Sequence, residues 1–541
     1  MGGSVALSNP RGSNLASLTV TGIETIHLNQ EIKVAGSLDG DAGTVNVGAS
    51  AKVAQGVKLV GASGTVDIAI GTYSDGAVTV GKEDLTVDVP AGATGFSFSL
   101  ADGIEDITVT GDGAVNITGN SGNNNISPGL GNNSVDGGDG FDEVTLPGNQ
   151  ADYTLTAVGT VLTFTHNTTA AVNTISNVEK VVFDDSKLFT VTEGMSIQTA
   201  INAASSGDTI RVFAGTYQGN LTISEKNLTL LGPNAGLNNP YGTRVPEAVI
   251  TASSTTNLIV LDNDADGGYQ YTIDGFKLVG ADYANDLQGS VVWVRGGGTV
   301  TNLKNNLIEM SSSTSDTKRM VQLGTTSNNS GSDFISGVIS HNTFTAAGTG
   351  SGFNGITTQK WSKDLSIIGN RFVAMKGQRN VLLNHATSGI VISDNEFFTS
   401  DNLGTRELLR LDGTPSSGST VGVSVVNNTF NTLGRAVYIV SAYVAGTTIN
   451  NNSFGDTAGA KKLEHNSTTS VLNANGNWWG TTTDSAIAGF VSGSVDFSPY
   501  LGSGTDSDTS AIGFQSTKSS VYVTTLGAQL GTDGRIKEGL A

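Results

Sequence analysis

The 541-residue chain has no cysteine, so disulfide bonds and thiol chemistry are both excluded. Only 14% of its residues are charged, and 48 acidic side chains against 28 basic ones give a formal net charge of −20. This balance disfavours nucleic acid and anionic membrane surfaces as partners. No apolar run is long enough to cross a bilayer, and no apolar leader segment follows the first residues. We therefore expect neither a membrane span nor an N-terminal signal.

Strong helix formers are also scarce. Glycine alone contributes 72 residues, and Val, Ile, Thr, Ser and Asn are abundant, a composition that favours short strands joined by tight turns. A hydrophobic content of 37% is low for a packed globule but suits a solenoid, whose core is one coil wide. Because the length exceeds that of one ordinary compact domain, we expect an all-β, multidomain β-solenoid.

The clearest internal repeat occupies residues 110–145, which divide into four rows of nine: TGDGAVNIT, GNSGNNNIS, PGLGNNSVD and GGDGFDEVT. The last row matches the calcium-binding pattern G-G-x-G-x-D-x-U-x at every defined position. The column of glycines and the column of inward-pointing apolar residues are Gly113, Gly122, Gly131, Gly140 and Ile117, Ile126, Val135, Val144. A regular two-row coil is therefore predicted.

If two rows form one coil, position six of alternate rows stacks, which places Val115 on Asn133 and Asn124 on Asp142. Carboxylate and carbonyl oxygens are the ligands that Ca²⁺ prefers. Asn124, Asp142 and the neighbouring Asp139 are therefore the predicted calcium ligands. The alternative is a metal-free coil held by side-chain amides.

These rows resemble those of the RTX (repeat-in-toxin) family of secreted bacterial proteins. The segment 146–187 is similar to the small β-unit that often follows such rows, through its D-Y-T-L element (Asp152–Leu155) and its closing N-V-E-K-V-V-F-D-D (Asn177–Asp185). The resemblance implies calcium as the cofactor, a type I-like secretion route and an extracellular location.

A second pattern covers residues 188–500. Met195–Ala204 has helical spacing, and strands are predicted at Thr209–Phe213, Leu221–Ile223 and Leu228–Leu231. An asparagine, one intervening residue and a large apolar residue then recur at Asn306/Ile308, Asn342/Phe344, Asn370/Phe372, Asn395/Phe397, Asn428/Phe430, Asn452/Phe454 and Asn477/Trp479. We expect the asparagines to adopt the left-handed conformation at a bend and to stack their amides, with the aromatic rings stacked in the core.

This second pattern resembles a right-handed parallel β-helix of the pectin-lyase type with a short N-terminal capping helix. Residues 1–109 are Gly/Val/Thr-rich and are expected to form a β-solenoid or β-sandwich region. Residues 501–520 have the composition of a linker. Residues 521–541 resemble the start of a further β-helix repeat, because Arg535–Leu540 parallels Ser196–Ile201, and this suggests a segment of a longer protein.

Two further stretches carry candidate binding residues. Asp262, Asp264 and Asp266 have the D-x-D-x-D-G spacing of a calcium loop, although its twelfth position is Ile273 instead of a glutamate, so an acidic solvated turn is the alternative. Lys376 and Arg379 belong to a basic patch that could bind an anionic glycan.

No catalytic residues are predicted, because the chain has neither G-x-S-x-G nor H-E-x-x-H. We expect a calcium-stabilised structural or adhesive protein of a bacterial cell surface, such as a component of an S-layer, a surface fibre or a matrix. Its partners would be further copies of itself or neighbouring surface proteins and glycans. The alternative is a polysaccharide lyase or related enzyme that acts on acidic glycans.

Overall fold

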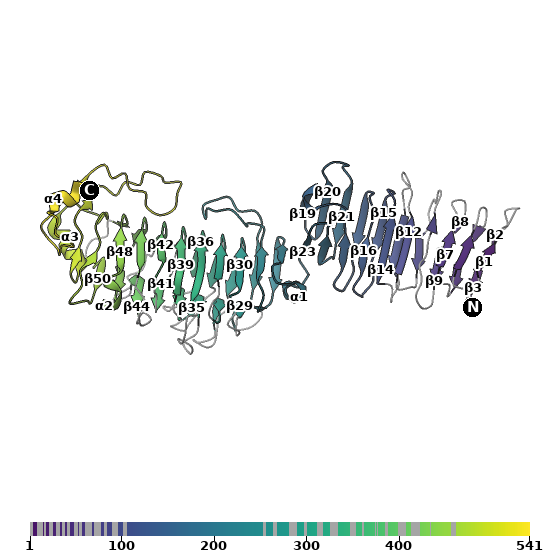
Figure 1. The fold of residues 1–541 in the computed structure, drawn as a ribbon, viewed down its shortest axis with the longest axis horizontal. Coiled ribbons are helices and arrows are strands. Elements are labelled where there is room, and N and C mark those ends of the chain that lie inside the picture. The colour runs from purple at the N-terminus through teal and green to yellow at the C-terminus, as the bar shows by residue number, and fades with distance from the viewer. Residues whose placement is uncertain are drawn as a thin grey trace. The chain divides into compact units, whose positions relative to one another are not determined.

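A computed structural model of the chain divides into two compact units, Met1–Met195 and Ser196–Ala541, called here the N-terminal and the C-terminal unit. Before residue 105, the structure describes strand backbone and the side chains of Phe98 and Leu100. From there on, it describes residues 105–252, 256–262, 268–280, 289–296, 300–310, 318–324, 334–346, 353–359, 362–373, 375, 377–384, 388–398, 407–412, 422–432, 434–455 and 461–540. Strands dominate both units (Figure 1).

The first part of the N-terminal unit consists of short strands that pair in parallel with the strands of neighbouring coils. One sheet joins β1 (Ser4–Leu7), β4 (Thr25–Leu28), β7 (Thr44–Val47), β10 (Ile68–Ala69), β12 (Asp84–Asp88) and β14 (Asp106–Thr110). Smaller sheets join β2 (Asn14–Leu15), β5 (Lys33–Val34) and β8 (Lys52–Val53), and β3 (Leu18–Val20), β6 (Leu38–Gly40) and β9 (Val57–Leu59). A further parallel pair is β11 (Ala77–Val80) with β13 (Phe96–Leu100). Parallel stacking of this kind is the arrangement of a β-solenoid.

Each of the four rows forms one strand: β15 (Val115–Thr118), β16 (Asn125–Ser127), β17 (Asn133–Asp136) and β18 (Glu143–Thr145). Alternate rows pair in parallel, with Ile117 opposite Val135 and Ile126 opposite Val144. All four of these apolar side chains are buried. The strands therefore follow the predicted register, two rows to a coil.

The segment after the rows extends both sheets. A short 3-10 turn (η1, Gln150–Asp152) leads into a hairpin of β19 (Tyr153–Val158) and β20 (Val161–His166), and β20 pairs antiparallel with β21 (Val172–Ser176). Then β21 and β22 (Lys180–Val182) pair in parallel with β17 and β18, and β23 (Lys187–Val191) lies antiparallel to β22. Tyr153, Phe164 and Phe183 form an aromatic cluster beneath the hairpin.

The C-terminal unit is a stack of coils whose strands form three parallel sheets. The first contains β24 (Thr209–Val212), β27 (Leu228–Leu231), β30 (Gln270–Asp274), β33 (Val300–Lys304), β36 (Ile335–Ser340), β39 (Ser362–Ile368), β42 (Ile390–Ser393), β45 (Val423–Val426), β48 (Thr447–Asn450), β51 (Leu472–Asn473) and β53 (Val495–Asp496). The second contains β25 (Gly215–Gln218), β28 (Ala248–Thr251), β31 (Lys277–Gly280), β34 (Leu307–Met310), β37 (Thr343–Ala346), β40 (Arg371–Val373), β43 (Glu396–Phe398), β46 (Thr429–Asn431) and β49 (Ser453–Phe454).

The third sheet contains β26 (Leu221–Ser224), β29 (Ile259–Asp262), β32 (Ser290–Val294), β35 (Lys318–Leu323), β38 (Phe353–Thr358), β41 (Gly377–Asn384), β44 (Glu407–Asp412), β47 (Arg435–Ile439), β50 (Leu463–His465) and β52 (Val491–Ser492). Helix α1 (Ile197–Ala203) packs against β24 and β26 at the start of the stack. It buries Ile197, Ala200 and Ile201, as its spacing predicts. In the part of the chain that the structure describes, no helix is long and apolar enough to cross a membrane.

A ladder of buried asparagines runs along the bend between the first and second sheets. From Asn342 onward, Oδ1 of each asparagine accepts both the backbone N–H and an Nδ2–H of the asparagine one coil earlier, at 2.8–3.0 Å. Each Nδ2 also donates to a main-chain carbonyl of the preceding coil. The members are Asn306, Asn342, Asn370, Asn395, Asn428, Asn452 and Asn477. The predicted stacking of amides is confirmed.

The left-handed backbone lies one residue earlier than predicted. The residue before each ladder asparagine has the positive φ, and the ladder residues themselves do not. These turn residues are Asn305, His341, Gly369, Asp394, Asn427, Asn451 and Gly476, with φ between 55° and 67°. The turn must come first because it redirects the chain so that the next side chain points inward. Gly, Asn and Asp tolerate this conformation best.

Two residues beyond each ladder asparagine, a large apolar side chain fills the core. From Phe344 to Trp479 the rings stack nearly parallel, with centroids 4.6–5.2 Å apart and interplanar angles of 4–10°. The earlier Ile308 continues the same column, because it lies opposite Phe344. One coil before the ladder, Phe276 takes the place of the asparagine, and its N–H still donates to Asn306 Oδ1 at 3.0 Å.

Two segments outside the coils lie against this bend (Figure 1). In the loop 232–247, the Asn238 N–H donates to Asn305 Oδ1, and Tyr241 O–H lies 2.5 Å from both carboxylate oxygens of Glu396. The segment 501–520, whose composition predicts a linker, folds back over earlier coils, where the Phe514 N–H donates to the Asn427 carbonyl at 2.7 Å. Phe514 and Ile512 are buried there.

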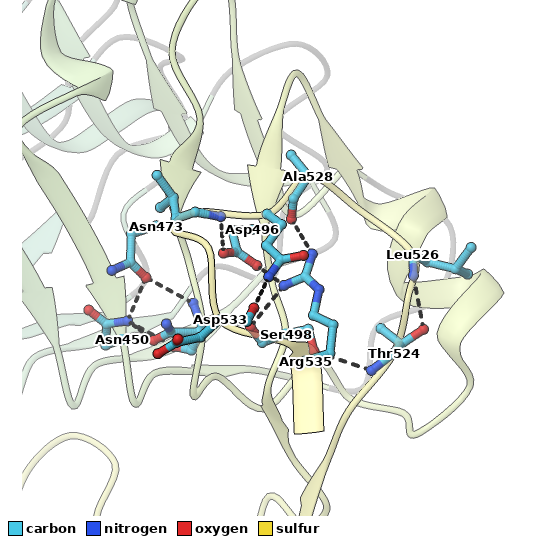
Figure 2. Close-up of polar contacts among 12 residues, drawn as sticks. Asn450, Asn473, Asp496, Ser498, Thr524, Leu526, Ala528, Asp533 and Arg535 are labelled. Atoms are coloured by element: carbon cyan, nitrogen blue, oxygen red, sulfur yellow. Dashed lines mark hydrogen bonds and ion pairs between the residues drawn. The ribbon is translucent and has the colours of Figure 1, made fainter. Parts of the chain in front are cut away.

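The C-terminal residues pack against the last coil. Strand β54 (Tyr500–Leu501) pairs antiparallel with β55 (Val521–Tyr522), and the short helices α2 (Ser441–Val444), α3 (Asp484–Phe490) and α4 (Arg535–Leu540) complete the unit. Arg535 at the start of α4 is anchored on buried Asp496, with Nη1 2.5 Å from Oδ1 (Figure 2). Ile536 and Leu540 of α4 are 76% and 83% exposed, whereas their counterparts in α1, Ile197 and Ile201, are buried.

Candidate functional site

The structure brings together the predicted position-six residues of alternate rows. The Asn124 N–H donates to Asp142 Oδ1 at 2.7 Å, and the Asp142 N–H donates to Glu179 Oε2 at 2.7 Å. On the other side of the coil, the Val115 N–H donates to Asn133 Oδ1 at 3.2 Å. Sequence reasoning missed Glu179 because it lies beyond the rows, although the strand that follows it continues the same sheet as β18.

Asp142 is the electrostatic centre of this column. Its side chain is fully buried, and Oδ2 has no hydrogen-bond partner. Burial raises the pKa of Asp142 to about 7, and the charges of Glu179, Asp136 and Asp139 add to the effect, while the Asn124 N–H opposes it. The pKa of Glu179 is also raised, mainly by burial. An ionised carboxylate is therefore costly here unless a cation or a proton accompanies it.

The predicted calcium ligands differ in how far their oxygens are free to bind a cation. The buried, unbonded Asp142 Oδ2 is a hard oxygen of the kind that Ca²⁺ binds, whereas Asn124 Oδ1 already accepts the Asn120 N–H at 2.9 Å. Asp139 is exposed. Among the described residues, no three His, Asp or Glu side chains gather into a group that could hold a metal ion. Of the three predicted ligands, Asp142 alone therefore offers a buried oxygen without a hydrogen-bond partner, and any further ligands of a cation would have to be other than these side-chain groups.

Glycine is required where the backbone passes this column. A Cβ on Gly119 would collide with the Gly137 carbonyl oxygen, and a Cβ on Gly137 would collide with the Asn177 carbonyl oxygen and with Asp142. The main chains of successive coils therefore leave no room for a side chain at Gly119, beside Asn124, or at Gly137, beside Asp142.

The second predicted calcium loop is described at its first residue alone. Asp262 ends β29, and its Oδ2 accepts a hydrogen bond from Arg295 Nη1 at 2.9 Å. The Arg295 guanidinium also lies 5.1 Å from the centroid of the Trp293 ring. Asp264 and Asp266 lie outside the described residues, so this prediction stays open.

Arg379, predicted as a glycan-binding residue, belongs to an ionic cluster on the third sheet. Glu407 of β44 is buried and binds three arginines, one from its own strand and one from each of the neighbouring strands β41 and β47. The Arg379 Nε and Arg410 Nη1 atoms lie 2.8 and 3.0 Å from Glu407 Oε1, and Arg435 Nη1 lies 3.8 Å from Oε2. Lys376, the second predicted residue, lies outside the described residues.

The arginines of this cluster are all matched by carboxylates of the chain. Arg410 also pairs with Asp412 at 2.5 Å, and Arg435 pairs with Glu464 at 2.9 Å. Both guanidinium groups lie over the Tyr438 ring, 4.8 and 5.0 Å from its centroid. Each of the three successive strands β41, β44 and β47 carries one of these arginines. The sequence did not reveal the cluster because the three arginines recur at unequal intervals along the chain.

Comparison with known proteins finds no matching family, no matching curated protein and no matching solved structure.

Proposed function

We propose that this protein is a structural or adhesive component of a bacterial cell surface, with RTX-like rows followed by a right-handed parallel β-helix. The observation that carries the proposal is the asparagine ladder with its stacked rings. The residues that recur from coil to coil serve the stack itself, because they close its hydrogen bonds and fill its core. A long body of this kind suits a fibre, a surface layer or a matrix better than a compact catalyst.

Calcium is the second part of the proposal. Asp142 would hold the ion, with neighbouring main-chain carbonyls as the remaining protein groups. The bound ion supplies the positive charge that a buried carboxylate needs, so it stabilises the folded coil over the unfolded chain. Low calcium inside the cell would then leave the rows unfolded for a type I-like export, and millimolar calcium outside would fold them.

A polysaccharide lyase is the alternative. Such an enzyme would need a cation to neutralise the uronate of an acidic glycan and a Lys or Arg base beside it. The ionic cluster around Glu407 is the place on the third sheet where Arg379 could act. Because Arg379, Arg410 and Arg435 are all paired with carboxylates, this cluster supports a structural role over catalysis.

The test is to follow hydrogen exchange of the full chain in calcium and in chelator, with electron microscopy of the same samples. Calcium should slow exchange in peptides that cover Gly119–Thr145 and should promote ordered fibres or sheets. In parallel, the protein is incubated with polyuronates. Release of unsaturated sugar that is lost in Lys376→Ala, with no assembly at any calcium concentration, would favour the lyase instead.

A further inference from the structure

A cavity of about 390 Å³ opens in the N-terminal unit between the turns of the rows and the β19–β20 hairpin. From the rows it is lined by Asp112, Leu130 and Asn132, and from the segment after them by Tyr153, His166 and Asn173. We infer that this cavity is a binding site for one or two rings of a neutral sugar. The inference does not rest on the proposed structural role or on calcium.

Leu130 is the first observation. It occupies position three of its row, where the other rows carry Asp112, Ser121 and Asp139. A solenoid turn needs no apolar side chain at this position, and Leu130 is 57% exposed although every apolar column residue of the rows is buried. The fold of the row therefore does not explain this leucine, whereas its place in the wall of the cavity does. With Tyr153 and Pro147 it supplies the apolar surface against which the C–H groups of a pyranose ring pack.

The second observation is the set of hydrogen-bond donors. Asn132 Oδ1 accepts the Val172 N–H at 2.8 Å, and Asn173 Oδ1 accepts from Asn133 Nδ2 at 2.8 Å. Both residues line the cavity, and each amide also carries an N–H₂ group that can donate. His166 Nδ1 accepts the N–H groups of Thr168 and Thr169, which places the imidazole proton on Nε2. Donors of this kind match the hydroxyl oxygens of a sugar.

The third observation is charge. Asp112 carries the only formal charge among the lining residues, all of which the structure describes. A site without a cation is unfavourable for uronates, phosphates and sulfates, whereas a carboxylate accepts hydrogen bonds from neutral hydroxyl groups. The volume lies at the lower end of the range for ligand pockets, about 300–1,000 Å³, which suits a mono- or disaccharide.

The wall of the site is held in place before any ligand binds. In the turn that closes β20 onto β21, Ala170 has φ of 58°, a left-handed conformation that a non-glycine residue rarely adopts. The turn is held by two hydrogen bonds of 2.9 Å, from the Ala170 N–H to the His166 carbonyl and from the His166 N–H to the Ala171 carbonyl. The Tyr153 hydroxyl donates to the Pro147 carbonyl at 2.6 Å, which fixes the ring.

The test is a titration of the full chain with neutral hexoses, N-acetylhexosamines and their disaccharides, beside the matching uronic acids, by calorimetry and saturation-transfer NMR. We expect a neutral sugar to bind with a dissociation constant of about 0.1–1 mM, as is reasonable for so small a ligand. Leu130→Asp, which restores the residue type of the other rows, should weaken binding by about tenfold or more. Asn132→Asp keeps the acceptor for the Val172 N–H but removes the N–H₂ donors, so it should also weaken binding by about tenfold or more.

The control is Val158→Ser at the exposed tip of the hairpin, which should bind as the unchanged protein does. Circular dichroism melts must be the same for all variants, so that loss of binding is not loss of folding. The inference is overturned if no neutral sugar binds, if uronic acids bind in their place, or if Leu130→Asp and Asn132→Asp both bind with unchanged affinity.

Discussion

In both units a side-chain oxygen of one coil accepts a backbone N–H of the coil before it, but the accepting side chains differ. In the C-terminal unit a side-chain oxygen of one coil accepts the backbone N–H of the coil before it, and that oxygen belongs to an asparagine seven times in succession. In the N-terminal unit, one column of such bonds ends on Asn133, and the other ends on the carboxylates of Asp142 and Glu179. An amide also brings N–H₂ donors, which bind the next asparagine and a carbonyl, whereas an ionised carboxylate has acceptors alone.

A coil must both stack on its neighbour and give every buried polar group a hydrogen-bond partner, and the two columns show that the first does not guarantee the second. The asparagine ladder meets both, so it is stable without any further component. The carboxylate column stacks equally well, but it leaves Asp142 Oδ2 unbonded in a buried place. It therefore depends on a proton or a cation, and the stability of the N-terminal unit should respond to pH and calcium in a way that the ladder does not.

The largest effect is expected from the core of the C-terminal unit. Phe372 is fully buried between Phe344 and Phe397, with ring centroids 4.6 and 5.0 Å away. Phe372→Ala should lower the free energy of unfolding by about 3–5 kcal/mol, the usual cost of truncating a buried aromatic residue. Tryptophan fluorescence during denaturation isolates this unit, because all four tryptophans lie at positions 293, 361, 478 and 479.

The matched control for Phe372→Ala is Phe398→Ala, one position beyond the ring stack and partly exposed. It should cost far less. A loss below about 1 kcal/mol in Phe372→Ala would show that the stacked column is not the core of this unit.

Introducing a carboxylate into the ladder should reproduce the weakness of the N-terminal column. Asn395 Nδ2 donates to the carbonyls of Ile367 and Ser393 and to Asn428 Oδ1. Asn395→Asp removes these donors and buries a charge, so at pH 8 we expect a loss of about 3 kcal/mol, measured by the same fluorescence. Asn427→Asp changes the turn residue instead and should be nearly neutral. Equal effects of the two substitutions would contradict the special role of the ladder amides.

The reverse exchange should strengthen the N-terminal unit. In calcium-free buffer at pH 8, Asp142→Asn removes the buried charge while it keeps the acceptor for Asn124, so we expect a gain of about 1–2 kcal/mol. Slower hydrogen exchange in peptides that cover 119–145 would record it. In calcium the order should reverse, because the unchanged protein gains a bound ion and the variant does not. A variant that calcium stabilises as much as the unchanged protein would place the ion elsewhere.

The same aspartate predicts a pH dependence. Its folded pKa of about 7 lies above its ordinary value of 3.8, so folding favours the protonated form. The stabilisation is complete below about pH 4 and is lost as the pH rises towards 7. Hydrogen exchange in calcium-free buffer should therefore show that the stability of the unchanged protein rises relative to that of Asp142→Asn as the pH falls from 8 to 5. A constant difference would mean that Asp142 does not titrate in this range.

The smallest effect has the opposite sign and lies in the C-terminal unit. Burial, with Lys304 nearby, lowers the pKa of the turn residue His341, so its contribution is present above about pH 6.5 and is lost as the pH falls through the folded pKa. Other coils carry asparagine at this turn, so His341→Asn should keep the fold and remove this part of the pH dependence. Fluorescence melts at pH 5 and 8 would measure it, with an expected change below about 1 kcal/mol. Identical profiles would assign the titration to other groups.

Much of the C-terminal unit could be predicted because the same residue types recur at the same positions of successive coils. The spacing of Asn395 and Phe397 and of their counterparts predicts the buried ladder and the stacked rings, and the spacing in Met195–Ala204 predicts α1. The turn residue was misplaced by one position, because Asn occurs both at the turn and in the ladder in Asn427-Asn428 and Asn451-Asn452, and the sequence does not distinguish their backbone conformations.

Features that depend on neighbours along the chain and on a fixed period could be predicted from the sequence alone. They are the two-row register of β15–β18, the coil length of the ladder and the dominance of strands. Contacts between residues far apart in the sequence became visible in the folded chain. Glu179 meets Asp142 across 37 positions, Tyr241 meets Glu396 across 155, and Glu407 gathers arginines from three coils. A repeat specifies the core and the bend of each coil because these contacts recur at a fixed period, whereas the segments of unequal length between the strands decide which polar and charged side chains of different coils come together.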